Sequence, residues 1–222
     1  LTTCNSSTLS LSANSLSASL NIVGGGDFGN AIHGANAGVI AGCRNTAKGI
    51  VSFVGGGTCN TANGLSGASI LGGAFNSTNN TGTVIGGGYC NIVSECFSAL
   101  LGGCCNTVGN TFSIIGGGCL NNAQGSFNNI FGGYKNTVCS NNSSVVGGNN
   151  NCVASAATGV FILGSGLSAF DATQANTTFV NTISAQTAVA GTTLSAEDGI
   201  DFNGSIIGCN FIIKKGIIIG IN

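Results

Sequence analysis

The amino-acid sequence predicts an all-β fold: a parallel β-solenoid, or β-roll, of short 14–17-residue coils, followed by a small irregular C-terminal β region. A glycine motif returns at a nearly fixed interval along most of the chain, and two apolar residues precede each return. Glycine makes up 39 of 222 residues. Proline, which would remove a donor from a sheet ladder, is absent. Together these features favour short strands separated by glycine corners.

Residues 1–21 come before the first motif. They place leucines among serines, at Leu9, Leu11, Leu16 and Leu20. Because this segment lacks the repeat, we expect it to form an irregular opening coil.

Residues 22–165 hold the repeats. Gly-Gly-Gly begins at Gly24, Gly55, Gly86 and Gly116, and the motif returns at Gly147 with Asn149 in its third place. A shorter motif of one or two glycines lies between these, beginning at Ala41, Gly72, Gly102, Gly132 and Gly164. We call each occurrence of either motif a glycine mark. The intervals alternate between 16 or 17 residues and about 14, which is too short for a helical hairpin repeat. We predict one coil per mark, with glycines turning the corners because they permit positive φ and close backbone approach.

Two further columns repeat in step with the glycines. An apolar pair such as Phe53-Val54 precedes each mark, and strand alternation predicts that one member points inward and the other outward. An asparagine follows most marks, at Asn45, Asn60, Asn76, Asn91, Asn106, Asn121 and Asn136, with Asn30 and Asn151 in line. Asparagine tolerates the left-handed backbone region, and stacked asparagines form hydrogen-bonded ladders between coils. A small apolar residue two places later, such as Ala62, is expected in the core.

Residues 166–222 break the pattern. Phe211–Ile213 and Ile217–Ile219 lie on either side of Lys214-Lys215-Gly216, which predicts a β-hairpin. A repeat array needs a cap at each end. We therefore expect this region to be a closing unit or neck.

The composition limits the partners. Charged residues make up 5% of the chain and the formal net charge is −1, so there is no electrostatic footprint for nucleic acid. No apolar run approaches the ~20 residues of a membrane span, and we expect no membrane insertion. A globular surface normally carries many more charges. The sparse charge predicts that other copies of the chain cover much of each copy.

Catalytic patterns are weak. Gly24 to Gly29 fits a dinucleotide fingerprint, but no helix pattern follows it and the same glycines recur elsewhere as corners. His33 is the only histidine, and Glu197, Asp198 and Asp201 form the only acidic cluster. Calcium binding by this cluster is less well supported than a solvated turn. We expect no enzyme activity, no cofactor and no metal site.

Cysteine is unusually frequent, with 11 residues. Cys90 and Cys105 each directly precede a repeat asparagine, and Cys104 and Cys119 each stand two places before one. Equivalent residues of neighbouring coils should lie ~4.8 Å apart, within the Cα separation usual for disulfides. Cys90 with Cys105 and Cys104 with Cys119 are therefore candidate disulfides. Packing as small apolar thiols is an equally good alternative.

The repeats resemble a known family. The segment Asn60-Thr61-Ala62-Asn63-Gly64, continued by Ser69-Ile70-Leu71-Gly72-Gly73, is similar to the head repeats of trimeric autotransporter adhesins and to repeats in phage tail fibres and giant-virus proteins. The resemblance implies a left-handed parallel β-roll in which three chains wrap one axis. It also implies a location outside the cell or on a virion surface. The implied partners are the chain itself as a homotrimer, other fibre or virion proteins, and a cell-surface glycan or receptor.

The functional prediction is a structural fibre or adhesin segment that supports or performs receptor attachment. An ice-binding solenoid is the alternative. It would need a regular threonine face, and the threonines after the repeat asparagines (Thr46, Thr61, Thr107, Thr137) are interrupted at Ser77, Ile92, Asn122 and Cys152. A glycan-degrading fibre enzyme is a third possibility, but it would need a carboxylate pair that the sequence does not offer.

Overall fold

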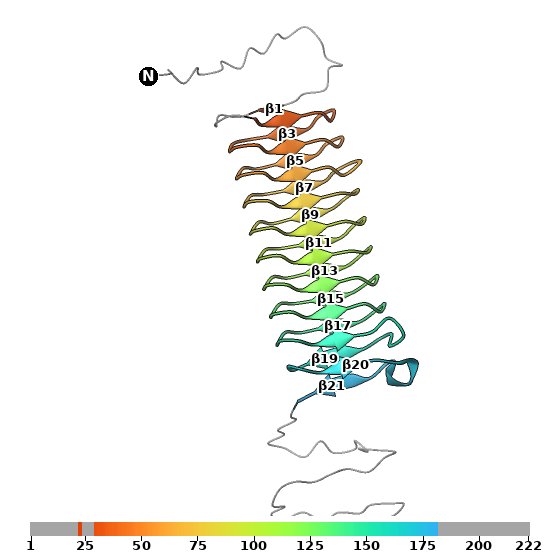
Figure 1. The fold of residues 1–222 in the computed structure, drawn as a ribbon. Helices are drawn as coiled ribbons and strands as arrows, with labels where there is room; N and C mark the ends of the chain where they lie inside the picture. The colour runs from red at the N-terminus through yellow and green to blue at the C-terminus, as the bar shows by residue number, and fades with distance from the viewer. Residues whose placement is uncertain (1–21, 24–28, 182–222) are drawn as a thin grey trace, which may run out of the picture. The chain divides into compact units, whose positions relative to one another are not determined.

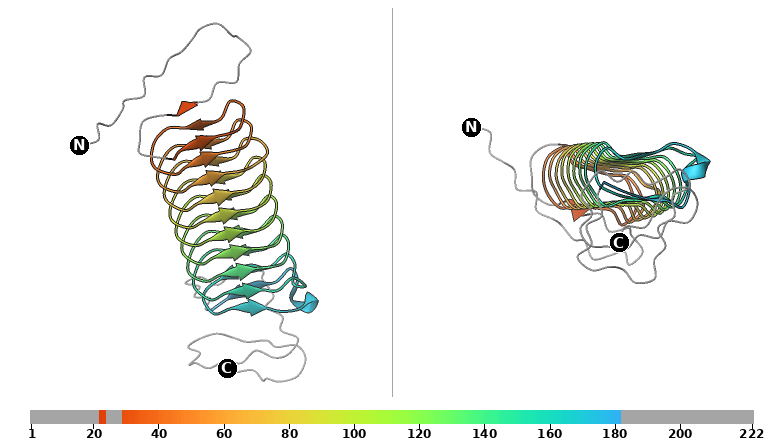
Figure 2. Two further views of the ribbon diagram at one scale, coloured as in Figure 1. Left: turned by 45° about the horizontal axis from the view of Figure 1, so that its top comes forward. Right: turned by 90° about the horizontal axis from the view of Figure 1, so that it is seen from below.

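The protein is a parallel β-solenoid in which short coils stack into a column (Figure 1). The computed structural model describes residues 22–23 and 29–181. Each full coil contributes one strand to each of two parallel sheets, one of eleven strands and one of ten. Figure 2 shows the coils lying nearly over one another when viewed along the column. The predicted all-β solenoid is confirmed, and the only helical segment among the described residues is a 3-10 turn at Ala172–Gln174.

The strands alternate between the sheets along the chain. The first sheet contains β1 (Ile22–Val23), β3 (Gly38–Val39), β5 (Phe53–Val54), β7 (Ser69–Ile70), β9 (Val84–Ile85), β11 (Ala99–Leu100), β13 (Ile114–Ile115), β15 (Asn129–Ile130), β17 (Ser144–Val145), β19 (Phe161–Leu163) and β21 (Thr178–Val180). The second sheet contains β2 (Ala31–Ile32), β4 (Thr46–Ala47), β6 (Thr61–Ala62), β8 (Ser77–Thr78), β10 (Ile92–Val93), β12 (Thr107–Val108), β14 (Asn122–Ala123), β16 (Thr137–Val138), β18 (Cys152–Val153) and β20 (Ser168–Ala169).

Both parallel sheets continue past residue 165. β18 pairs with β20 and β19 pairs with β21, so hydrogen bonding goes on where the sequence pattern places the start of the closing unit. The end of the glycine motif therefore marks a change in the corners and not the end of the stack. The opening coil (1–21), Gly24 and the hairpin with its acidic cluster (within 182–222) lie outside the described residues.

The coils are more uniform than the glycine spacing predicts. Between residues 38 and 144, partners in the first sheet are 15 or 16 residues apart. The interval is 17 residues in the last two steps, from Ser144 to Phe161 and from Phe161 to Thr178. The alternation of 16 or 17 with 14 is therefore not an alternation of coil length. It arises because the glycine mark begins directly after the buried strand residue in one coil, as at Gly55, and one residue later in the next, as at Gly72.

A narrow core fills the space between the sheets. The first sheet buries a large residue in each coil: Val39, Val54, Ile70, Ile85, Leu100, Ile115, Ile130, Val145 and Ile162. The second sheet buries mostly smaller ones: Ala47, Ala62, Thr78, Val93, Val108, Ala123, Val138, Val153 and Ala169. In these nine coils one residue of each apolar pair is thus buried, and its partner lies outside the core. Large residues facing small ones keep the two sheets close along the whole column.

Each coil has two corners of the same design. A residue with positive φ, such as Cys105 (φ 54°) or Phe112 (φ 54°), turns its N–H back toward the preceding coil, whereas neighbouring N–H groups bond to the next coil. Cys105 N donates to Tyr89 O at 2.9 Å, while Cys104 N donates to Gly118 O at 2.9 Å. Asparagine tolerates positive φ, but the column asparagines do not themselves adopt it. That conformation belongs to the residue before each one.

Candidate functional site

The outward side of the first sheet is the most distinctive surface of the described residues. In each coil the buried residue is flanked by one residue before it and one after it, and strand alternation points both away from the core. The preceding positions are Gly38, Phe53, Ser69, Val84, Ala99, Ile114, Asn129, Ser144 and Phe161. The following positions are Ile40, Gly55, Leu71, Gly86, Leu101, Gly116, Phe131, Val146 and Leu163. We call these two columns together the apolar face.

The apolar face is well exposed and uncharged. Leu71, Leu101 and Phe131 are 59%, 62% and 64% exposed, and every coil from Ile40 to Leu163 carries at least one large apolar side chain on this face. Neither column contains Asp, Glu, Lys, Arg or His. Soluble monomers rarely expose a contiguous apolar patch of this length. The face therefore has the character of a surface that another molecule covers.

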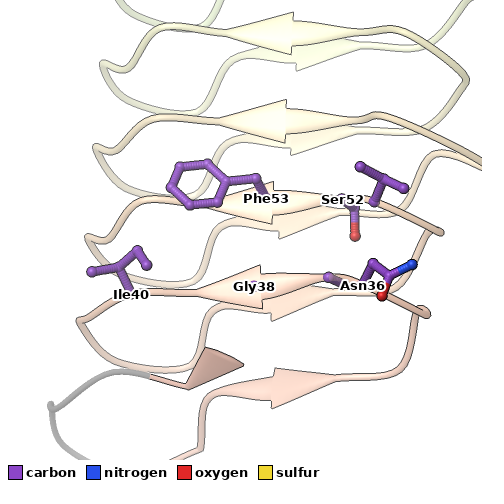
Figure 3. Close-up of a pocket in the computed structure, with 7 residues that line it drawn as sticks. Asn36, Gly38, Ile40, Ser52 and Phe53 are labelled. Atoms are coloured by element: carbon purple, nitrogen blue, oxygen red, sulfur yellow. The ribbon is translucent and has the colours of Figure 1, made fainter. Parts of the chain in front are cut away.

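A shallow hollow of about 410 Å³ opens at the edge of the apolar face (Figure 3). Gly38, Ile40 and Phe53 line it from the face, and Asn36 and Val51 line it from the adjacent corner. The hollow lies where Gly38 contributes no side chain between its larger neighbours. The corner that contains Asn36 and Val51 and the apolar face therefore meet at this hollow.

The corner glycines named from the sequence fall into two groups. At Gly55, Gly86 and Gly116 an added Cβ would lie 2.4, 2.3 and 2.5 Å from a carbonyl oxygen of the next coil. At Gly72, Gly102, Gly132 and Gly147 it would meet open space. None of these seven residues has a positive φ. Positive φ falls instead on the last glycine of each mark, such as Gly57 (φ 92°) and Gly103 (φ 93°). Only the first group is thus explained by close approach of the backbone.

The repeat asparagines are brought together in one buried ladder. Asn106 donates from Nδ2 to Gly102 O (3.2 Å) and to Gly118 O (3.0 Å), and its Oδ1 accepts from Asn121 N (2.9 Å). The same pattern joins Asn45, Asn60, Asn76, Asn91, Asn106, Asn121, Asn136 and Asn151. These bonds satisfy the backbone groups that the corner turns away from the sheet ladders. The ladder is therefore structural, because its side chains are buried and hydrogen-bonded.

The opposite corner holds a second polar ladder that the sequence reasoning missed. Ser113 N donates to Ser98 Oγ, Asn128 N to Ser113 Oγ, and Ser143 N to Asn128 Oδ1, at 3.0–3.1 Å. All four residues are buried. The available signal was a small polar residue two places before most buried residues of the first sheet, at Ser52, Thr83, Ser98, Ser113, Asn128 and Ser143. Serine is so common in this chain that the column does not stand out.

The four cysteines singled out from the sequence lie together at the asparagine corner as free thiols. The Sγ atoms of Cys104 and Cys105 are 3.4 Å apart. The hydrogen bond with Cys104, then burial, then the charges of Cys104 and Cys90 raise the pKa of Cys105 to about 11. Burial and then Cys104 raise the pKa of Cys119. Cys104 and Cys119 sit opposite each other in neighbouring coils, and cross-linking of the two pairs stays a prediction.

Aromatic rings stack along the opposite corner. The rings of Phe97, Phe112 and Phe127 stack with centroid separations of 5.5 and 5.1 Å, and each ring is about half exposed. All three residues have positive φ, which costs roughly 1–2 kcal/mol for a side chain of this kind. Ring stacking of about 0.5–1.5 kcal/mol per pair offsets part of that cost.

The remaining candidate chemistry is sparse. His33 is exposed. Within residues 22–23 and 29–181 no three histidine, cysteine or acidic side chains come together as a metal site. No helix long and apolar enough to cross a bilayer occurs in that same part of the chain.

Comparison with known proteins adds no relative. No protein-family model matches the sequence, and a search of curated proteins finds no match. The likeness to adhesin and tail-fibre repeats therefore rests on the repeat pattern, with which the solenoid fold is compatible.

Proposed function

We propose that this chain is a rigid structural segment of a fibre or adhesin at a virion or cell surface, in which other copies of the chain cover its apolar face. The observation that carries the proposal is the continuous, uncharged apolar face that runs from Ile40 to Leu163. Left bare, such a face would favour non-specific association with other apolar surfaces. Cyclic closure with other copies buries it and ends the association.

The architecture suits a load-bearing spacer. Backbone hydrogen bonds run between successive coils along the column, as in Leu101 N to Ile115 O at 3.0 Å. Both polar ladders add side-chain bonds in the same direction. Bending the column would strain bonds in several coils at once. A stiff, uncharged rod of this kind supports a tip or a binding surface without needing chemistry of its own.

The partners follow from the proposal. Three copies of the chain about one axis is the number that the family resemblance implies. Other fibre or virion proteins would continue the rod, and a surface glycan or receptor would bind to it or to its tip. Immunogold electron microscopy of the intact particle or cell that carries the chain would test the location, since labelling confined to the cytosol would contradict it.

Light scattering of the purified chain tests self-association. We expect a mass that is a small multiple of 21.6 kDa in non-denaturing buffer. The double variant Leu71→Lys/Leu101→Lys should give monomers, because each charge would be buried without a partner. The matched variant Thr61→Lys/Thr107→Lys, on the outward side of the second sheet, should keep the mass of the natural chain. A monomeric natural chain would contradict the proposal.

Ice binding is the second candidate. The outward positions of β4, β6, β12 and β16 hold Thr46, Thr61, Thr107 and Thr137 in register. The strands between β6 and β12, and between β12 and β16, interrupt them with Ser77, Ile92 and Asn122. Measurable thermal hysteresis that Thr61→Lys/Thr107→Lys abolishes would favour this function over the fibre.

A further inference from the structure

The two columns of the apolar face alternate in size. In the coils of Val54, Ile85 and Ile115 the preceding position is large (Phe53, Val84, Ile114) and the following position is glycine. In the coils of Val39, Ile70, Leu100, Ile130 and Val145 the preceding position is small or polar (Gly38, Ser69, Ala99, Asn129, Ser144) and the following position is large. Each of these eight coils thus has one large and one small side. The coil of Ile162 is the exception, with Phe161 and Leu163 both large.

Part of this alternation has a cause within the chain. A Cβ at Gly86 or Gly116 would overlap a carbonyl oxygen of the next coil, and at Gly55 it would also lie 3.4 Å from the Phe53 ring. The small preceding residues are different, because the same column accepts Phe53, Val84 and Ile114 in the neighbouring coils. Ser69, Ala99 and Asn129 therefore carry the inference: they are small where the fold accommodates large side chains.

The geometry of rotation gives the alternation a use. The preceding and following positions lie along the two edges of the apolar face, because they flank one buried residue along a strand. When copies are related by rotation about an axis parallel to the column, the following position of one copy meets the preceding position of the next, at the same height. In the coil of Leu100, Leu101 would then meet Ala99 of the neighbouring copy. A large side meets a small side in all eight coils, whether the axis relates two copies or three, and two large residues, Phe161 and Leu163, meet in the coil of Ile162.

An antiparallel pair fits less well. Its two-fold axis lies across the column and brings following positions against following positions. With equal coils facing each other, Leu101 would meet Leu101. If one copy of the antiparallel pair is shifted by an odd number of coils, large residues meet small ones in most coils. The match is incomplete because the neighbouring coils of Ile130 and Val145 both carry their large residue at the following position. Centred between Ile85 and Leu100, for example, such a pair would set Ile40 against Val146.

We propose that this alternation is a register device. Copies of the chain associate parallel and in register about an axis parallel to the column, and each large residue of the apolar face packs against the small side of the same coil in the neighbouring copy. The proposal rests on the self-association proposed above and adds the polarity and the register of the partner, which are fixed by shape on a face that has no charges to fix them.

A residue swap tests the device. Ala99→Leu puts two large residues in one coil and should weaken self-association about tenfold or more, because overpacked contacts cost that much. Leu101→Ala should weaken it by loss of apolar contact. The double variant Ala99→Leu/Leu101→Ala restores one large and one small side and should regain most of the natural affinity, measured by sedimentation equilibrium. A double variant as weak as the two single losses combined would overturn the proposal.

Cross-linking supplies an independent measurement. Benzoylphenylalanine at position 101, in assemblies mixed from isotope-labelled and unlabelled chains, should cross-link to the peptide that contains Ala99 in another copy. Cross-links from an assembled species to a different coil would overturn the register while leaving self-association intact. A monomeric chain would overturn both.

Discussion

Thr78 is the described residue whose buried side-chain oxygen, Oγ1, has no hydrogen-bond partner. It occupies a core position that is Ala62 in the coil before and Val93 in the coil after. An unsatisfied buried hydroxyl costs about 1–3 kcal/mol. Thr78→Val should therefore raise the free energy of unfolding by about 1–2 kcal/mol, measured by urea denaturation at fixed protein concentration.

Thr83→Val is the matched control for this prediction. Thr83 is also buried, but its Oγ1 donates to Asn80 O at 2.7 Å. Its replacement should lower the free energy of unfolding by about 1 kcal/mol. Equal effects of the two substitutions would show that the Thr78 hydroxyl is satisfied in solution.

The thiol of Cys105 should react slowly near neutral pH. Its pKa is raised to about 11, first by the hydrogen bond with Cys104. The thiolate is the nucleophile, so at pH 8 the reactive fraction is about 100-fold below that of a thiol whose pKa is 9. Its rate of alkylation should keep rising as pH increases toward 11, followed by mass spectrometry of the modified peptides. Cys104→Ser should lower the pKa and speed the reaction at pH 8, and a rate that levels off below pH 9 in the natural chain would contradict this assignment.

At the scale of the element, the asparagine ladder couples each coil to the next. Asn106 makes bonds to Gly102 O, Gly118 O, Asn91 Oδ1 and Asn121 N. Asn106→Ala would leave Asn121 N buried without a partner, and we expect a loss of about 3 kcal/mol in the free energy of unfolding.

Asn30→Ala provides the comparison for the ladder. Asn30 lies at the start of the described ladder and is half-buried, and among the described residues it bonds to Gly42 O and Asn45 N. Its loss should cost about half as much as that of Asn106. Hydrogen exchange should show faster opening around residues 106–121 in the Asn106 variant. Unchanged exchange there would mean that water replaces the side chain.

At the scale of the whole molecule, the column should tolerate removal of whole coils. Deleting residues 92–121 removes two coils of 15 residues and joins Asn91 to Asn122. A ladder asparagine is then still followed directly by a strand of the second sheet, as in the natural chain. The chain should fold into a column shorter by ~9.6 Å, since each coil rises ~4.8 Å. Small-angle scattering measures this length.

Deleting residues 92–114 instead is the control, because it joins Asn91 to Ile115 and places a residue of the first sheet in the second. That chain should lose cooperative unfolding, because nearest-neighbour contacts hold such arrays together. Equal folding of both deletion variants would contradict the register described above.

The sequence by itself determined the repeat, the number of residues per coil to within two, and the two columns that form the core and the asparagine ladder. These follow from side-chain chemistry that recurs at a fixed interval, so Phe53-Val54 and Asn60 can be read without any structure. The tertiary structure alone decided which member of each apolar pair is buried, because that depends on a one-residue shift of the glycine mark between coils.

The tertiary structure also decided which residues take the left-handed conformation. Local preference favours glycine and asparagine there, yet Cys105, Phe112 and Val51 occupy it. The physical reason is that a corner must turn one N–H back toward the preceding coil, as Cys105 N does toward Tyr89 O. Hydrogen bonds to two neighbouring coils outweigh the ~1–2 kcal/mol of local strain, and no single coil of sequence contains that information.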